Sequence, residues 1–128
     1  MLSVRPFSMR TAGAAMLACC LLVLTEAGAD GVREFNVVAK KYEFTPSRFE
    51  VMQGETVRIV IKSADSKHGF GIKELDVKTE VPKTGEPVTL EFVATEAGEF
   101  EIKCTKYCGK GHKTMTGLLV VRPNAGSQ

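Results

Sequence analysis

The sequence predicts an all-β domain, and the spacing of its apolar runs favours a Greek-key sandwich or barrel of roughly seven or eight strands. Short runs of alternating apolar and polar residues follow one another from Glu34 onward, as expected for strands that bury one face. Glycine and proline residues separate these runs, and no long stretch has the apolar period of an amphipathic helix. The length of 128 residues, with 44% hydrophobic and 25% charged residues, fits one ordinary globular domain.

The expected strands can be taken in chain order from their inward-facing apolar positions. These are Phe35, Val37 and Ala39; Phe49 and Val51; Val57, Ile59 and Ile61; Val88, Leu90, Phe92 and Ala94; Phe100 and Ile102; and finally residues 117–121. Turns are expected at Gln53 and Gly54 and at Ala97 and Gly98. Residues 63–71 and 104–115 do not alternate and are predicted to be loops.

The N-terminal 29 residues have the pattern of a secretory signal peptide. Arg5 and Arg10 precede the apolar residues 11–24, and the small residues 27–29 fit a cleavage site. The apolar run is shorter than the roughly 20 residues that cross a bilayer as a helix, so an uncleaved anchor is the weaker alternative. A lipoprotein signal ending at Cys19 is weaker still. We therefore expect residues 30–128 to be a periplasmic or otherwise exported domain without a stable membrane span.

Charge and motifs exclude several classes of function. The formal net charge is +2, and no basic run with interleaved aromatic residues appears, which disfavours nucleic-acid binding. No glycine-rich phosphate loop follows a strand and opens a helix. The chain also lacks a convincing base and orienting group for a nucleophilic enzyme.

Two cysteines remain once the predicted signal peptide is removed, and their neighbours suggest a metal site. Cys104 and Cys108 alone would most simply form a disulfide in an oxidising compartment. However, His112 and Met115 follow within the same twelve residues, and His68 lies in the other predicted loop. Thiolate and thioether ligands together favour copper over zinc, magnesium or calcium.

The number of thiols bears on the number of ions. A mononuclear blue-copper site uses one cysteine, so a second one is surplus. Two thiolates could instead bridge two metals, each capped by one histidine, with Met115 and a backbone carbonyl between the cysteines as weak ligands.

The spacing Cys-x3-Cys-x3-His-x2-Met resembles the binuclear CuA motif of cytochrome c oxidase subunit II and nitrous oxide reductase. With residues 63–70 (Ser-Ala-Asp-Ser-Lys-His-Gly-Phe), it is similar to the soluble cupredoxin domain of subunit II, most of all in B-type haem-copper oxidases. The resemblance implies a cupredoxin fold and one-electron transfer without substrate chemistry. It implies these ligands: bridging Cys104 and Cys108, terminal His68 and His112, axial Met115, and the carbonyl of Lys106 opposite it.

The resemblance also implies redox partners, namely a cytochrome or a terminal oxidase or reductase, and a copper chaperone that loads the site. The chain has no tryptophan, so Tyr42 or Phe44 is a candidate for the point where electrons enter. The candidate ligand segments carry Lys67, Lys103, Lys106, Lys110 and Lys113. Because Glu101 is the one acidic residue between positions 100 and 121, we expect a partner with an acidic docking face.

Several alternatives stay open from the sequence. The same soft ligands would suit a copper-trafficking protein that holds one Cu(I) and passes it on, and a disulfide-closed module would bind no metal. Asp65 could either orient His68 or cap a turn. Tyr107 could shield the metal or simply pack against the domain.

Overall fold

The computed structural model describes residues 31–126, so the predicted signal peptide lies outside the described residues. The strands in this range are β1 (Val32–Lys40), β2 (Glu43–Thr45), β3 (Arg48–Met52), β4 (Thr56–Ser63), β5 (His68–Ile72), β6 (Val77–Val81), β7 (Val88–Val93), β8 (Gly98–Lys103) and β9 (Thr116–Arg122). Two single-turn 3₁₀ helices, η1 (Lys73–Leu75) and η2 (His112–Thr114), are the only helical elements within residues 31–126. The predicted all-β fold is confirmed.

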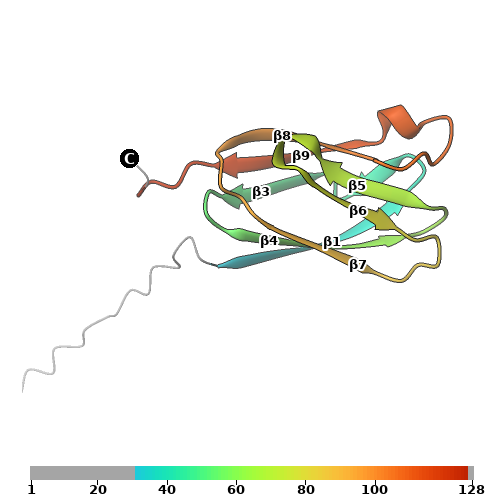
Figure 1. Ribbon diagram of the computed structural model, residues 1–128, viewed down its shortest axis with the longest axis horizontal. Coiled ribbons are helices and arrows are strands. Elements are labelled where there is room, and N and C mark those ends of the chain that lie inside the picture. The colour runs from blue at the N-terminus through green and yellow to red at the C-terminus, as the bar shows by residue number, and fades with distance from the viewer. Residues whose placement is uncertain (1–30, 127–128) are drawn as a thin grey trace, which may run out of the picture.

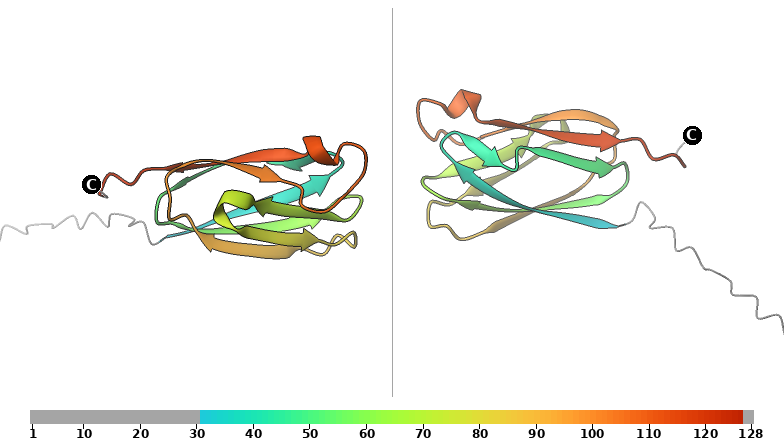
Figure 2. Two further views of the ribbon diagram at one scale, coloured as in Figure 1. Left: turned by 45° about the horizontal axis from the view of Figure 1, so that its top comes forward. Right: turned by 180° about the vertical axis from the view of Figure 1, so that it is seen from behind.

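The strands form two sheets that lie face to face (Figure 1). One sheet has the order β2-β1-β4-β7 and the other the order β3-β9-β8-β5-β6. β1 pairs with β4 and β3 with β9 in parallel, whereas the other pairs are antiparallel. β6 and β7 are neighbours along one side of the sandwich, and Figure 2 shows the same two layers from behind. This crossed strand order is what the Greek-key prediction requires.

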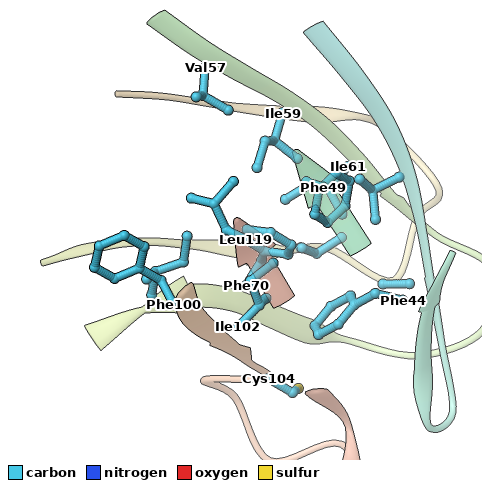
Figure 3. Packing of buried hydrophobic residues seen from close by; sticks show 14 of the residues in the cluster. Phe44, Phe49, Val57, Ile59, Ile61, Phe70, Phe100, Ile102, Cys104 and Leu119 are labelled. Atoms are coloured by element: carbon cyan, nitrogen blue, oxygen red, sulfur yellow. The ribbon is translucent and has the colours of Figure 1, made fainter. Parts of the chain in front are cut away.

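The core lies between the sheets and is built from the predicted inward faces. Along β4, Val57, Ile59 and Ile61 are fully buried, and the residues between them are not. Phe44 and Phe70, from opposite sheets, meet edge to face with ring centroids 5.2 Å apart (Figure 3). Each fully buried apolar side chain of this size stabilises the fold by about 1.5–3 kcal/mol. The metal-loop residue Cys104 lies at the edge of the same cluster.

Two parts of the strand prediction were wrong. Residues 63–71 were expected to form a loop, but His68 begins β5, and all five residues of β5 are buried. A strand buried on both faces does not alternate, and here Gly69 and Gly71 supply the second face without side chains. The short β2 and the edge strand β6 were not predicted, and the described strands therefore exceed the expected seven or eight.

A buried carboxylate, Glu55, fixes the turn between β3 and β4. Its Oε2 accepts the Met52 N–H at 2.9 Å and its Oε1 accepts from Arg33 at 3.1 Å. The hydrogen bond from Met52, aided by Arg33 and opposed by burial, lowers the pKa of Glu55 below its usual 4.5. A lowered folded-state pKa means that this stabilisation is complete above the unfolded-state pKa and is lost as the pH falls through the folded value.

Replacing Glu55 with Gln is expected to lower the free energy of unfolding by about 1–3 kcal/mol at neutral pH, because a charged hydrogen-bond acceptor is lost. The difference from the wild type should shrink as the pH falls below 4.5, where the wild-type carboxylate also protonates. Denaturant unfolding at several pH values measures this, with the exposed Glu96→Gln as the control. A loss of stability that is the same at all pH values would contradict the assignment.

Candidate metal centre

The candidate ligands gather at one end of the sandwich, at the right in Figure 1. His68 stands at the start of β5, and residues 104–115 form the connection between β8 and β9, which includes η2. A hydrogen bond from the Cys104 N–H to the Met115 carbonyl, 3.1 Å long, closes the base of this connection. We call residues 104–115 the ligand loop. The loop therefore starts and ends on paired strands of one sheet.

Three metal-binding side chains form the centre of the site. The candidate donor atoms of His68, Cys104 and Cys108 all lie within 4.8 Å of one another, and all three residues are buried. Both cysteines are free thiols, and their Sγ atoms are 3.5 Å apart, well beyond the roughly 2.05 Å of a disulfide bond. The arrangement is that of two thiols facing a common point and not of a disulfide-closed loop.

The other three predicted ligands lie around the cysteines. The Lys106 carbonyl oxygen is 3.1 Å from the Cys104 Sγ. The His112 Nδ1 and the Met115 Sδ are each 3.8 Å from the Cys108 Sγ. Met115 is fully buried, and its neighbours are these sulfur atoms as well as the core. The fold thus brings all six predicted residues together, and their role as copper ligands remains a prediction.

The hydrogen bonds of His68 leave one ring nitrogen available. Its Nε2 is 2.7 Å from Asp65 Oδ1, and Asp65 Oδ2 accepts the Lys41 N–H at 2.7 Å. Partial burial opposes ionisation of Asp65, but hydrogen bonds from Lys41, His68 and Ser66 outweigh it and lower its pKa to about 2. The ionised carboxylate holds the proton on Nε2 and leaves Nδ1 as an acceptor. Among the described residues, the buried Nδ1 has no hydrogen-bond partner.

This orphaned nitrogen fits a metal ion. A buried imidazole nitrogen without a partner is costly, and a metal beside two thiols would satisfy it. Asp65 also caps its own turn through the Ser66 N–H, so both roles considered for it are present. The donor set of imidazole, thiols, thioether and carbonyl is the one that copper prefers.

Replacing Asp65 with Asn is expected to weaken copper binding by about 10- to 100-fold, as is typical when the partner of a histidine ligand is changed. Asn keeps the size of the side chain but removes the charge that fixes the ring proton. Competition with a copper chelator measures the affinity. The control is Asp76→Asn, an exposed position with a left-handed φ of 52° that Asn tolerates. Equal losses in both variants would contradict the orienting role.

Burial also governs the thiols. It raises the pKa of the Cys108 thiol to about 11, with a further contribution from Cys104 nearby. A bound cation beside the sulfur reverses this balance and displaces the proton. Metal binding at this site is therefore coupled to proton release.

Glycines let neighbouring segments approach the ligand loop closely. An added Cβ at Gly69 would lie 2.2 Å from the Thr105 Oγ1 and 2.8 Å from the Lys106 nitrogen. On the other side, the ring of Tyr42 fills the space beside Gly109 and Gly111. Sequence reasoning missed the roles of Thr105 and Tyr42 here. The signal was the pair of glycines at positions 69 and 71, directly after a candidate ligand.

The lysines around the site are less uniform than the sequence suggested. Glu80 on β6 contacts both Lys106 and Lys67, at 2.9 and 3.2 Å, and Lys103 contacts Glu101 at 3.1 Å. Lys110 and Lys113 are exposed, and no ion pair involves them within residues 31–126. The free positive charge near the site is therefore concentrated on the second half of the ligand loop.

The two residues considered for electron entry differ sharply in exposure. Phe44 is 2% exposed and packs on Phe70, so it does not reach the surface and that suggestion was wrong. Tyr42 is 37% exposed. Tyr107 is 75% exposed, with its ring centroid 5.7 Å from that of His112, so it does not pack into the core.

Comparison with known proteins identifies the family. Residues 13–121 match the family described as "Cupredoxin-like domain". This chain belongs to the cupredoxin family. It is 36% identical over 86 residues to cytochrome c oxidase subunit 2 of Thermus thermophilus, an alignment covering 67% of this chain and 63% of the relative. A second subunit 2, from another strain of that organism, is also 36% identical, and the match covers 51% of its length. The chain thus spans less than two thirds of these relatives.

Solved cupredoxin structures agree with the fold. The periplasmic domain of cytochrome oxidase subunit II (CoxB) of Bradyrhizobium japonicum superposes with a TM-score of 0.63 at 19% identity, covering 71% of this chain and 84% of that one. The blue copper protein auracyanin A of Chloroflexus aurantiacus gives a TM-score of 0.60 at 20% identity, covering 72% and 100%. Within residues 31–126, no helix of this cupredoxin is long and apolar enough to cross a bilayer.

Proposed function

We propose that this cupredoxin domain holds a binuclear CuA-type copper centre and carries single electrons. The observation that supports it most is the buried cluster of His68, Cys104 and Cys108, with the unpartnered Nδ1 beside two free thiols. Two copper ions supply a one-electron redox couple when bound at such a donor set. The similarity to cytochrome c oxidase subunit 2 favours the same reading.

The six residues divide the work of holding copper. Cys104 and Cys108 bind as bridging thiolates, which is why a second cysteine is needed. His68, through Nδ1, and His112 are terminal ligands. Met115 and the carbonyl of Lys106 are weak ligands, each from a group that stays in place without a strong bond. Soft sulfur ligands stabilise Cu(I), and imidazole suits both oxidation states.

The scaffold limits how far these donors move. His68 is hydrogen-bonded into β5, and the ligand loop is closed at its base by Cys104 and Met115. Within the loop, the His112 N–H donates to the Gly109 carbonyl at 3.1 Å. Donors fixed at both ends of a loop adjust little when an electron arrives, which keeps the reorganisation small.

We further propose an exported location, because residues 1–29 have the pattern of a signal peptide. A cytochrome, or a terminal oxidase or reductase, would be the redox partner, and a copper chaperone would load the site. The unpaired Lys110 and Lys113 favour a partner with an acidic docking face.

Electron exchange with small redox complexes tests this surface charge. The rate with anionic ferricyanide is expected to fall with added salt and the rate with cationic hexaammineruthenium to rise, because exposed positive charge steers the anion. Replacing Lys110 and Lys113 with Glu should lower the ferricyanide rate several-fold at low salt. The control is the exposed Lys73→Glu, on η1. A ferricyanide rate that does not fall with salt would contradict an acidic partner.

Copper stoichiometry separates this proposal from its alternatives. The reduced domain, loaded with excess Cu(II)/Cu(I) and passed over a desalting column, is expected to retain two coppers per chain against a chelator. A trafficking protein would retain one copper and exchange it rapidly. A module closed by a Cys104–Cys108 disulfide would retain none, and either result would overturn the proposal.

A further inference from the structure

The turn between β1 and β2 consists of Lys41 and Tyr42, and each residue reaches a different candidate histidine ligand. We propose that this turn is a clasp that positions both histidines, and that Tyr42 is a positioning residue for the site. The inference rests on the proposed function, since it assigns the clasp to the ligands of that centre.

The first arm of the clasp runs through Lys41. Its backbone N–H donates to Asp65 Oδ2 at 2.7 Å, and the other oxygen of Asp65 lies 2.7 Å from the His68 Nε2. The turn thus anchors the carboxylate that orients the ring of His68. Because the donor is a backbone group, this arm depends on where the turn lies and not on the lysine side chain.

The second arm is the ring of Tyr42. It lies so close to the ligand loop that a Cβ added at Gly111 would be 2.3 Å from its Cδ2, and one at Gly109 would be 2.5 Å from its hydroxyl. The carbonyls of these two glycines accept the first hydrogen bonds of η2, from His112 at 3.1 Å and from Thr114 at 3.0 Å. The ring therefore presses on the backbone that sets the position of His112.

The backbone at Gly111 supports this reading. Its φ of −89° is one that any residue adopts, so the turn itself does not require glycine at that position. What excludes a side chain is the Tyr42 ring. A substitution at Gly111 therefore reports on the contact with Tyr42 and not on backbone strain.

The test compares Tyr42→Ala, Tyr42→Phe, Gly111→Ala and the double variant Tyr42→Ala/Gly111→Ala, with the exposed neighbour Glu43→Ala as control. In the copper-free, reduced protein, we expect Tyr42→Ala and Gly111→Ala to speed amide exchange of residues 109–112 and alkylation of the buried Cys108 by at least about tenfold. Tyr42→Phe and Glu43→Ala should match the wild type. The double variant should be no worse than Tyr42→Ala, since the clash at Gly111 is then gone.

In the copper-loaded protein, Tyr42→Ala should change the visible absorption and magnetic signature of the site, and Tyr42→Phe should restore them. Unchanged exchange, alkylation and spectra in Tyr42→Ala would overturn the clasp; if electron transfer alone slowed, Tyr42 would be a contact for the partner instead. The copper-free measurements do not depend on copper binding. A failure of the proposed function would therefore show in the copper stoichiometry and leave the clasp result readable.

Discussion

Replacing Cys108 with serine is expected to reduce the copper content from two ions per chain to one at most and to weaken the remaining binding more than about a hundredfold. The Sγ of Cys108 is the most connected donor of the site, with the sulfur atoms of Cys104 and Met115 and the His112 Nδ1 all 3.5–3.8 Å away. A serine hydroxyl stays protonated and is a poor ligand for Cu(I), so both shared contacts to the metals are lost.

A graded series of variants makes this first prediction sharper. Met115→Leu should lower the affinity less than Cys108→Ser, because a weak ligand is exchanged for a side chain of similar volume. Met52→Leu, at the end of β3 and outside the site, should have no effect on copper binding. Metal analysis with chelator competition gives the order. Two tightly bound coppers in Cys108→Ser would contradict the bridging role of this thiol.

The second large effect is expected at the glycines of β5, because they set the distance between His68 and the ligand loop. A Cβ at Gly69 would lie 2.2 Å from the Thr105 Oγ1 and 2.8 Å from the backbone nitrogen of Lys106. Gly69→Ala must therefore move the loop backbone next to a candidate bridging cysteine. We expect a loss of about 1–3 kcal/mol in the free energy of unfolding, together with a loss of copper binding.

Gly71→Ala provides a matched comparison. Its Cβ would be 2.6 Å from the Thr105 Cγ2, and the next atoms are 3.1 Å away or more. Thr105→Ala should therefore largely rescue Gly71→Ala but not Gly69→Ala, where the contact with the Lys106 nitrogen remains. Thermal unfolding and copper binding of the single and double variants measure this, with Gly126→Ala, whose Cβ meets nothing nearer than 3.9 Å, as control. Equal rescue of both glycine variants would contradict the role given to the loop backbone.

The fold and the candidate site were open to prediction in different ways. Val57, Ile59 and Ile61 alternate because one face of β4 is buried, and this period survives in the sequence. The spacing from Cys104 to Met115 likewise marks the ligand loop, because all of its donors come from one short segment. Local patterns of this kind need no knowledge of the tertiary structure.

Contacts between distant segments left no such pattern. β5 was mistaken for a loop because Gly69 and Gly71 replace the side chains that would have shown alternation. Glu80 neutralises Lys67 and Lys106 from another strand, so counting charges along residues 100–121 overstated the basic surface. The contact of Tyr42 with Gly109 and Gly111 depends on how two loops approach each other, and only the structure reveals it.

A low-temperature electron paramagnetic resonance spectrum of residues 30–128, reduced and then loaded with copper, tests the central claim most directly. The account predicts a hyperfine pattern from one unpaired electron shared over two equivalent copper ions, held by Cys104 and Cys108. A spectrum of a single copper ion, or no signal from protein that has bound copper and been oxidised, would contradict it.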